Sequence, residues 1–145
     1  MQEPFVMLVD DEKPFVETMT KRMEKRNLKV VTAFSGSEAL EKLDKNRNMD
    51  VVILDVKMPG MDGIETLRAI KKTYPLTEVI MLTGHATVET AIEGMKLGAY
   101  DYLMKPCEMQ QLLEKVKEAT EKKRSHEEKI REAKVKEALS AHGLE

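Results

Sequence analysis

Polar and charged residues follow most of the short apolar segments in the sequence up to residue 104. They are Asp10-Asp11 after residues 5–9, Asp55 after residues 51–54, Thr83-Gly84 after residues 78–82 and Lys105-Pro106 after residues 100–104. If these segments are parallel strands of an open sheet, their carboxyl ends share one edge, and such sheets bind ligands there. We therefore expect these acids, the hydroxyl and the amine to converge on one site.

The chemistry of such a site follows from its charges. Three carboxylates at one edge repel one another, and a carboxylate without a partner there would tend to keep its proton. A divalent cation relieves this conflict, and carboxylates, a backbone carbonyl and water suit Mg2+. Lys105 adds a positive charge and Thr83 a hydroxyl. The set describes a metal-bridged site for an anion with several oxygens beside a carboxylate nucleophile, as in phosphoryl transfer to an aspartate.

Five apolar segments rich in strand-forming residues alternate with segments of helical spacing. The expected strands are Phe5–Val9, Leu28–Ala33, Val51–Leu54, Glu78–Leu82 and Tyr100–Met104. The apolar residues expected to mark the helices are Val16, Met19 and Met23; Ala39, Leu40 and Leu43; Ile64, Leu67 and Ile70; Val88, Ala91, Ile92 and Met95; Leu112, Leu113, Val116 and Ala119. This alternation predicts an α/β fold with a parallel sheet covered on both faces.

Start and stop signals agree with these elements. Ser35 and Glu38 form the pattern of a capping box before the second helix. Pro14 suits the first turn of the first helix, and Gly98 suits the end of the fourth. The second strand ends in Ala33-Phe34, without a charged residue, which fits a strand at the edge of the sheet.

The C-terminal segment has a different composition. Residues 117–137 are almost entirely Lys, Glu, Arg and Ala, with Ile130 and Val135 as the main apolar exceptions. We expect the fifth helix to run from near Glu108 to near Ala141, roughly 50 Å at 1.5 Å per residue. The sequence thus divides into a domain over residues 1–120 and a charged helical extension or linker over residues 121–145. A solvated helix, a frayed linker, a weak dimer helix and a stem toward another domain all remain open.

Length, charge and cysteine content exclude several classes of protein. The 145 residues suit one domain of ordinary size, and the formal net charge of −2 provides no overall attraction to nucleic acid or an anionic membrane. A signal peptide and a membrane-spanning apolar stretch are not evident. Cys107 is the only cysteine, so an intrachain disulfide is impossible and a reducing compartment is expected. We therefore expect a cytoplasmic protein that binds neither membrane nor nucleic acid through this chain.

Several separated motifs together resemble the signature of response-regulator receiver domains. They are Asp10-Asp11, the run from Val52 through Asp55 to Gly63, the run Met81-Leu82-Thr83-Gly84 and the run from Tyr102 to Lys105-Pro106. The resemblance spans about Phe5 to Val116. It implies a flavodoxin-like doubly wound five-stranded parallel sheet of order 2-1-3-4-5, here with a C-terminally extended last helix. Residues 84–86 and 98–102 also resemble receivers attached to bacterial enhancer-binding transcription activators.

The resemblance implies a role for each residue at the strand ends. Asp55 resembles the phosphoacceptor, and Asp10 and Asp11 resemble the acidic pair that holds Mg2+, Asp11 directly. The backbone carbonyl of Lys57 is expected to complete the protein ligands together with Asp55. Lys105 resembles the lysine that contacts the phosphoryl oxygens, and its bond to Pro106 is expected to be cis.

Switching and rate-setting residues also follow from the resemblance. Thr83 resembles the hydroxyl that moves to bond the phosphoryl group, and Tyr102 resembles the aromatic residue that swings inward with it. Lys57 and His85 stand at positions that tune phosphoryl arrival and loss. The implied partners are a sensor histidine kinase or phosphotransfer protein, with a homodimer through the fourth and fifth helices or the C-terminal helix as a further option. Two forms of output stay open, a single-domain regulator that acts by protein contact and a fragment of a longer chain. For a fragment, the resemblance favours control of transcription.

Three other functions compete with a phosphoacceptor switch that is not an enzyme. Hydrolases with an aspartyl-phosphate intermediate usually carry a second acid two residues after the nucleophile, where this sequence has Lys57. Nucleotide-binding domains carry G-x-G-x-x-G or G-x-x-x-x-G-K after the first strand, and neither pattern occurs here. The third alternative is a binding module in which phosphorylation is vestigial. Labelling with a small phosphodonor and Mg2+ separates the phosphoacceptor switch from these three alternatives.

Overall fold

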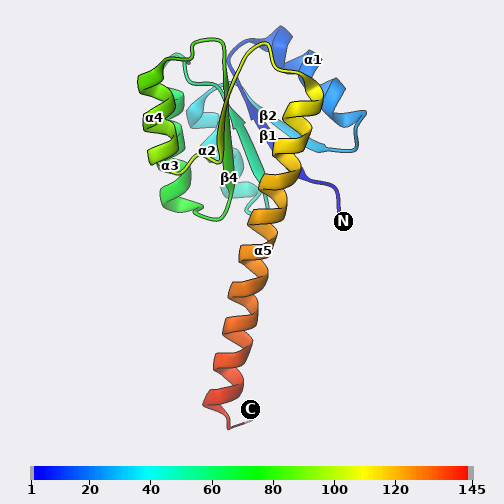
Figure 1. Cartoon of the computed structure of the whole chain (residues 1–145), viewed down its shortest axis with the longest axis vertical. Coiled ribbons are helices and arrows are strands. Elements are labelled where there is room, and N and C mark those ends of the chain that lie inside the picture. Colours follow the sequence, from blue (N-terminus) through cyan, green and yellow to red (C-terminus); the bar gives the residue numbers. More distant parts are fainter. Residues whose placement is uncertain (1, 144–145) are drawn as a thin grey trace.

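The computed structural model describes residues 2–143, in which strands and helices alternate and a long last helix projects from the sheet (Figure 1). The elements in chain order are β1 (Phe5–Val9), α1 (Lys13–Glu24), β2 (Lys29–Ala33), α2 (Gly36–Lys45), β3 (Val51–Leu54), α3 (Gly63–Thr73), β4 (Glu78–Thr83), α4 (Val88–Lys96), β5 (Asp101–Met104) and α5 (Met109–Ala141). All five expected strands and all five expected helices are present, and the predicted ends of the strands and of the last helix agree with the observed ones to within one residue.

The sheet has the predicted order, β2-β1-β3-β4-β5, and every neighbouring pair is parallel. The second strand therefore lies at an edge, as its uncharged end indicated. In the register of β1 and β3, Val9 pairs with Leu54. Asp10 and Asp55, the residues that follow these two, consequently leave the sheet side by side at its carboxyl edge.

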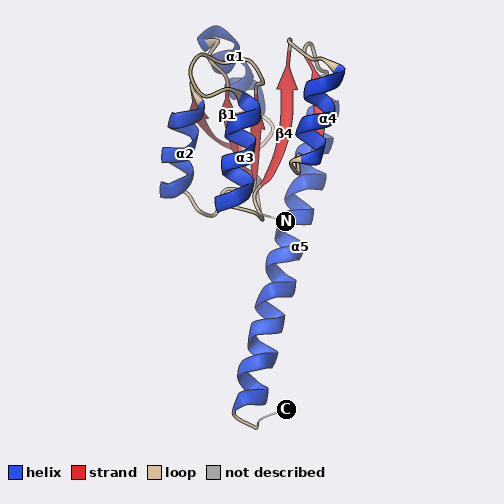
Figure 2. Ribbon diagram, turned by 90° about the vertical axis from the view of Figure 1, so that its left-hand side faces the viewer, coloured by secondary structure: helices blue, strands red, loops and turns tan. Residues whose placement is uncertain are grey.

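Helices cover both faces of the sheet, and Figure 2 shows α2, α3 and α4 on the face opposite α1 and α5. Alternate strand residues supply the two cores. Met7 and Val9 belong to the core under α2 and α3, whereas Val6 and Leu8 belong to the core under α1 and α5. All four residues of β3 are buried because both faces of this central strand are covered.

Side-chain caps begin the helices that face the site. Ser35 accepts a hydrogen bond from the amide of Glu38 at the start of α2, which is one half of the predicted capping box. The other half differs, because Glu38 Oε2 accepts from the amide of Phe34 and not from that of Ser35. Asp62 caps α3 and Thr87 caps α4 in the same manner. Gly98 ends α4 with a φ of +104°, a conformation that side chains other than glycine rarely adopt. Pro14 lies in the first turn of α1, as expected.

The apolar residues of α4 do not face the sheet. Val88, Ile92 and Met95 are exposed, and the only buried residue of the helix is Gly94. The backbone at Gly94 lies so close to the core that an added Cβ would contact Tyr102 at 3.7 Å. The helix is therefore held through its small residues, and its apolar stripe faces away from the core.

The last helix is continuous from the domain into the extension, as Figure 1 shows. Buried residues of α5 end at Lys123, and from Lys129 to Ala141 every residue is exposed. A frayed linker is thus not what this segment forms. Residues 144–145 of the predicted extension lie outside the described residues.

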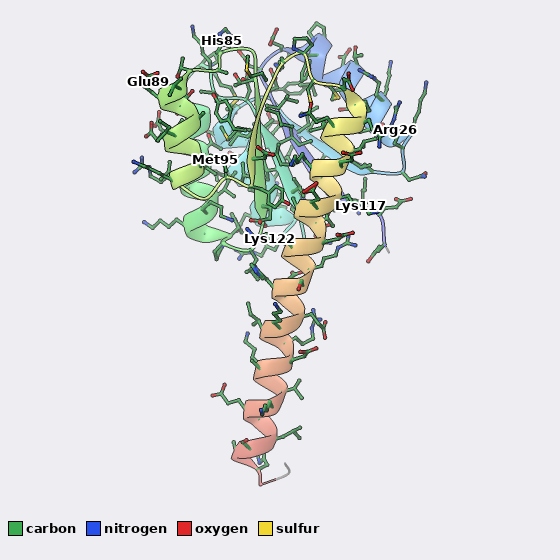
Figure 3. The ribbon with its side chains drawn as sticks, viewed as in Figure 1. Arg26, His85, Glu89, Met95, Lys117 and Lys122 are labelled. Carbon is green, nitrogen blue, oxygen red and sulfur yellow. The ribbon has the colours of Figure 1, made fainter. Side chains whose placement is uncertain are left out.

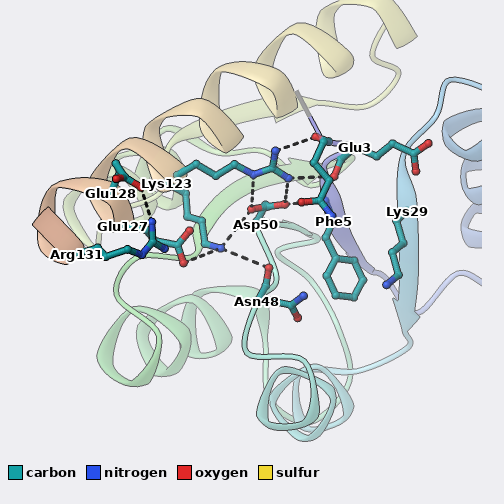
Figure 4. A pocket seen from close by; sticks show the side chains of 11 residues that line it. Glu3, Phe5, Lys29, Asn48, Asp50, Lys123, Glu127, Glu128 and Arg131 are labelled. Atoms are coloured by element: carbon teal, nitrogen blue, oxygen red, sulfur yellow. Dashed lines mark hydrogen bonds and ion pairs between the residues drawn. The ribbon is translucent and has the colours of Figure 1, made fainter.

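A cluster of ion pairs fixes α5 where it leaves the sheet, and Figure 4 shows Asp50 and Lys123 in it. We define the Asp50 clasp as these two residues and Arg124. Asp50 directly precedes β3 and is buried, and Lys123 is 4% exposed. Arg124 bonds both carboxylate oxygens of Asp50, and Lys123 Nζ lies 3.3 Å from Asp50 Oδ1. The amide of Phe5 also donates to Asp50 Oδ2, at 2.8 Å. The clasp joins β1, β3 and α5 at the edge opposite the carboxyl ends of the strands.

A second buried acid lies next to the clasp. Glu78 begins β4, pairs in register with Val51 of β3 and is 4% exposed. Lys71 of α3 lies 3.1 Å from Glu78 Oε1, and Lys122 of α5 lies 3.0 Å from Oε2. Three consecutive basic residues of α5 therefore neutralise two buried acids at this edge of the sheet.

Within residues 2–143, no helix combines the length and the apolar character needed to cross a lipid bilayer.

Candidate functional site

The acids that follow β1 and β3 form one cluster at the carboxyl edge of the sheet. Asp10, Asp11 and Asp55 each offer a carboxylate oxygen, and these oxygens all lie within 4.8 Å of one another. Asp10 and Asp55 are 1% and 2% exposed, whereas Asp11 is exposed. The predicted convergence of the three acids is thus present, with one open side toward solvent.

The backbone explains why these acids meet. The amide of Asp55 donates to the carbonyl of Val9, and the amide of Asp10 donates to the carbonyl of Ala33, so both aspartates continue the sheet by one residue. Asp10 then turns the chain into α1, because its Oδ1 accepts from the amide of Glu12 at 2.9 Å. Hydrogen bonds to the main chain therefore fix the positions of Asp10 and Asp55 at the edge of the sheet.

Electrostatics at Asp10 favours a positive ion in this cluster. Burial raises the pKa of the Asp10 carboxyl above its ordinary value; hydrogen bonds from Lys105 and from the Glu12 amide lower it, and the charge of Asp55 raises it again. Because the net pKa of Asp10 is raised, burial and the negative charge of Asp55 raise it by more than the interactions with Lys105 and the Glu12 amide lower it. A bound cation would supply the missing positive charge.

The donor types of the cluster suit a magnesium site. Mg2+ binds oxygen ligands, carboxylates among them, in a nearly octahedral arrangement. The oxygens of Asp10, Asp11 and Asp55 lie within 4.8 Å of one another, so all three can approach one ion. The donor set therefore fits Mg2+ in ligand type and in its gathering at one point.

Lys105 lies beside the acids, as the sequence predicted. Its Nζ is 2.6 Å from Asp10 Oδ2 and 3.2 Å from Glu12 Oε1. Burial lowers the pKa of Lys105, but the hydrogen bond to Asp10 and the charges of Asp10 and Asp55 more than offset it, and the net pKa is raised. Lys105 is therefore a fixed positive charge at neutral pH. The peptide bond from Lys105 to Pro106 is cis, as expected.

Asp55 presents one occupied and one open carboxylate oxygen. Its Oδ1 accepts from the amide of Val56 at 2.8 Å, and no described residue donates to Oδ2. A shallow hollow above Asp55 is lined by Asp11, Glu12, Asp55, Lys57, Met58, Pro59 and His85. Lys57 and His85, predicted to tune the reaction rate, are exposed at its rim, and Figure 3 places His85 at the end of the domain away from the extension.

Among the described residues, Thr83 and Tyr102 make no hydrogen bond to Asp10, Asp11 or Asp55. Thr83 is fully buried, and its Oγ1 accepts from the amide of His85 at 3.0 Å. The half-buried Tyr102 shares a hydrogen bond of 2.7 Å with Thr90 Oγ1 on α4. The two residues predicted to switch thus each have a partner, Thr83 in the segment before α4 and Tyr102 in the first turn of α4.

Sequence reasoning missed three residues around this site, namely Glu12, Phe15 and Thr90. Glu12 is an ion-pair partner of Lys105, and the ring of Phe15 lies under the Lys105 ammonium, 3.9 Å from Nζ to the ring centroid. These partners are 93 and 90 positions from Lys105. Sequence spacing alone gives no signal for such contacts, although the place of Glu12 directly after the aspartate pair could have drawn attention to it.

Comparisons with known proteins agree with this geometry. The sequence profile of the family described as "Response regulator receiver domain" matches residues 6–117. The DNA-binding transcriptional regulator NtrC of Escherichia coli K12 is 34% identical over 119 residues, covering 82% of this chain and 25% of NtrC. A putative NtrX-like response regulator of Rickettsia felis is 36% identical over 123 residues, covering 83% of this chain and 26% of that protein.

Solved structures show the same similarity. A response regulator receiver domain protein from Clostridium thermocellum superposes with a TM-score of 0.80 at 38% identity, covering 83% of this chain and 97% of that one. The chain thus aligns with nearly the whole of a solved single domain. It spans about a quarter of the length of the curated relatives that it matches.

Proposed function

This chain belongs to the response regulator receiver domain family, whose members are phosphoacceptor switches, and from this premise we propose that Asp55 is the phosphoacceptor. The phosphoryl group would come from a phosphohistidine on a sensor histidine kinase or a phosphotransfer protein. The observation that carries the proposal is the meeting of Asp10, Asp11 and Asp55 at one edge of the sheet, with Lys105 bonded to Asp10.

The transfer uses the open oxygen of Asp55. Oδ2 attacks phosphorus, a new O–P bond forms, and the P–N bond to the donor imidazole breaks. The imidazole nitrogen keeps the electron pair of that bond and then takes a proton. The amide of Val56 holds Oδ1 and thereby orients the attacking oxygen.

Asp10, Asp11, Asp55 and the backbone carbonyl of Lys57 would hold Mg2+, with Asp11 as a direct ligand. The ion, when bound, neutralises charge that develops on the phosphoryl oxygens. Lys105 provides a second positive charge, and its short bond to Asp10 keeps it next to the reacting group. These four side chains and one carbonyl form the phosphorylation site of this proposal.

Switching follows from a shift between two existing conformations. In the unmodified protein, Thr83 accepts from His85 and Tyr102 bonds Thr90. We infer that Thr83 turns toward the phosphoryl oxygens when Asp55 is modified and that Tyr102 then moves inward. This change would alter the surface of α4, β5 and α5, where Val88, Ile92 and Met104 are exposed.

Rate control is assigned to the rim of the hollow. Lys57 and His85 line the opening above Asp55. Both side chains are exposed and can influence the approach of a donor or of water. We propose that they tune phosphoryl arrival and loss.

The output belongs to a partner or to another domain. The similarity to NtrC and NtrX-like regulators supports control of transcription through an enhancer-binding activator. We propose no nucleic-acid contact by this chain, whose net charge is −2, and no enzymatic activity beyond its own phosphorylation and dephosphorylation. A homodimer through α4 and α5 or through the extension, and a cytoplasmic location, belong to the same proposal.

The test is incubation with a small acyl phosphate and Mg2+, followed by mass spectrometry of the intact chain. The wild type should gain one phosphoryl group, and Asp55→Asn or removal of Mg2+ should abolish the gain. Thr83→Ala should still be modified but should show a weaker change around Tyr102. Continued labelling of Asp55→Asn, or a wild type that stays unmodified, contradicts the proposal.

A further inference from the structure

The ammonium group of Lys105 lies in a seat made by three side chains that follow β1. We define the Lys105 seat as Asp10, Glu12 and Phe15. Nζ is 2.6 Å from Asp10 Oδ2, 3.2 Å from Glu12 Oε1 and 3.9 Å from the centroid of the Phe15 ring. The Lys105 side chain is 15% exposed, so most of its surroundings are these groups and not water.

The three members of the seat differ in how firmly they are fixed. Asp10 is buried and shared with the acidic cluster. Phe15 is half-buried in the first turn of α1 and packs against the core beneath that helix. Glu12 is 64% exposed and has no other side-chain partner among the described residues. An exposed ion pair of this kind is weak and easily exchanged for another, whereas the ring of Phe15 cannot leave without unpacking the core.

We propose that Phe15 and Glu12 are positioning residues for Lys105, an inference that rests on the proposed function. Phe15 keeps the ammonium at the site in every state, because a cation is attracted to the face of an aromatic ring. Glu12 occupies one N–H of the ammonium until a phosphoryl oxygen on Asp55 takes its place. The Lys105 seat thus keeps the ammonium next to Asp55, while the ion pair with Glu12 can be exchanged for a phosphoryl oxygen.

Two substitutions of Glu12 distinguish the effect of its negative charge from the effect of its contact with Lys105. Glu12→Gln removes both the ion pair and a negative charge near the incoming donor, whereas Glu12→Asp keeps the charge but shortens the side chain by one methylene. If contact with Lys105 is what matters, both variants should be phosphorylated by a small acyl phosphate about threefold faster, the change expected for losing one weak ion pair. Glu17→Gln is the matched control, since Glu17 is an exposed residue of α1 for which no ion pair is found among the described residues.

Phe15 is tested by keeping and removing the aromatic face. Phe15→Leu stays apolar but loses the attraction for the ammonium, and phosphorylation at saturating Mg2+ should slow about fivefold. Phe15→Tyr retains the face and should restore the rate. A purely structural role predicts a different pattern, in which both variants fall in proportion to their loss of thermal stability.

A spectroscopic signature tests the seat without any phosphorylation. Protons on the ε carbon of Lys105, held over the ring, should resonate upfield in the metal-free protein. The shift should disappear in Phe15→Leu and persist in Glu12→Gln. An ordinary shift in the wild type, or a Phe15→Leu protein that is phosphorylated at the wild-type rate, overturns the role of Phe15.

The outcomes also separate this inference from the proposed function. If the wild type accepts no phosphoryl group, the proposed function fails and the displacement of Glu12 fails with it, while the ring-current shift still decides whether Phe15 holds Lys105. If the wild type is phosphorylated and Glu12→Asp reacts no faster than Glu17→Gln, only the role of Glu12 is rejected.

Discussion

Arg124 binds Asp50 through both of its carboxylate oxygens, from Nε to Oδ1 at 3.2 Å and from Nη2 to Oδ2 at 2.9 Å. Asp50 directly precedes β3, and Asp55 directly follows it. One four-residue strand therefore carries the anchor of the extension at its amino end and the proposed phosphoacceptor at its carboxyl end. The two sites are held by the same rigid element of the sheet.

The Asp50 clasp should contribute strongly to stability. Asp50→Ala removes the carboxylate that Lys123 and Arg124 share, leaving Lys123 only its pair with Glu127, and it leaves the Phe5 amide without its acceptor. Breaking a buried pair by removing one partner typically lowers the free energy of unfolding by about 3 kcal/mol. Urea unfolding measures this loss. Arg131→Ala, which breaks an exposed pair with Glu128, is the matched control and should change stability by less than about 0.5 kcal/mol. Equal effects of the two substitutions would contradict the importance of the clasp.

The clasp also predicts where the folded unit ends. A chain that stops at residue 120 lacks Lys122, Lys123 and Arg124, so Asp50 loses both of its basic partners and Glu78 loses one of two. We expect this chain to melt well below the full-length protein. A chain that stops at residue 128 retains the clasp and should melt within a few degrees of full length, because residues from 129 to 141 are exposed. Calorimetry on the three chains decides, and similar melting of all three would place the boundary at residue 120.

The fold was predictable because each of its elements has a local pattern. The uniformly apolar β3, the Ser35 cap and the charges after the strands all act over a few residues, and the parallel topology then brings Asp10, Asp11 and Asp55 together. The Lys105 seat and the Asp50 clasp were not predictable, since Phe15 and Arg124 find partners 90 and 74 positions away. The sequence also did not predict that Val88, Ile92 and Met95 of α4 face away from the core. Gly94, which has no apolar side chain to mark the buried face, makes the contact with the core instead.

Magnesium should stabilise the folded protein through the acidic cluster. A ligand that binds only the folded state adds about 2.7 kcal/mol to the free energy of unfolding at 100 times its dissociation constant. Removing one carboxylate, as in Asp11→Asn, should weaken Mg2+ binding at least about tenfold and shift this stabilisation to higher Mg2+. Thermal unfolding over a Mg2+ titration measures both the stabilisation by Mg2+ and the Mg2+ concentration at which it sets in. Glu41→Gln removes an equal charge from an exposed site on α2 and should leave the titration unchanged.

The effect of Asp10 on the free energy of unfolding should depend on pH in the metal-free protein. In the metal-free protein the pKa of Asp10 is raised, so the folded state binds this proton at a higher pH than the unfolded chain does. The charged form of Asp10 therefore lowers the free energy of unfolding at neutral pH. This destabilisation disappears as the pH falls through the raised pKa of the folded state toward the ordinary pKa of the unfolded chain. Asp10→Asn should accordingly be more stable than wild type in EDTA near pH 7, with the difference shrinking as the solution is acidified. Urea unfolding at several pH values tests this, and excess Mg2+ should reverse the order.

The hydroxyl of Tyr102 should hold the amino end of α4. It bonds Thr90 Oγ1 at 2.7 Å, and Thr90 in turn completes the capping box with Thr87. Tyr102→Phe removes only the outer bond, worth about 1 kcal/mol, and should raise hydrogen exchange at residues 87–91 about fivefold. Thr90→Val removes that bond together with one half of the capping box, so its effect should be larger. Since α4 buries only Gly94, few other contacts compensate. Exchange at α3, which has its own cap at Asp62, should be the same in both variants, and unchanged exchange at α4 in Thr90→Val would show that Tyr102 and the cap do not hold this helix.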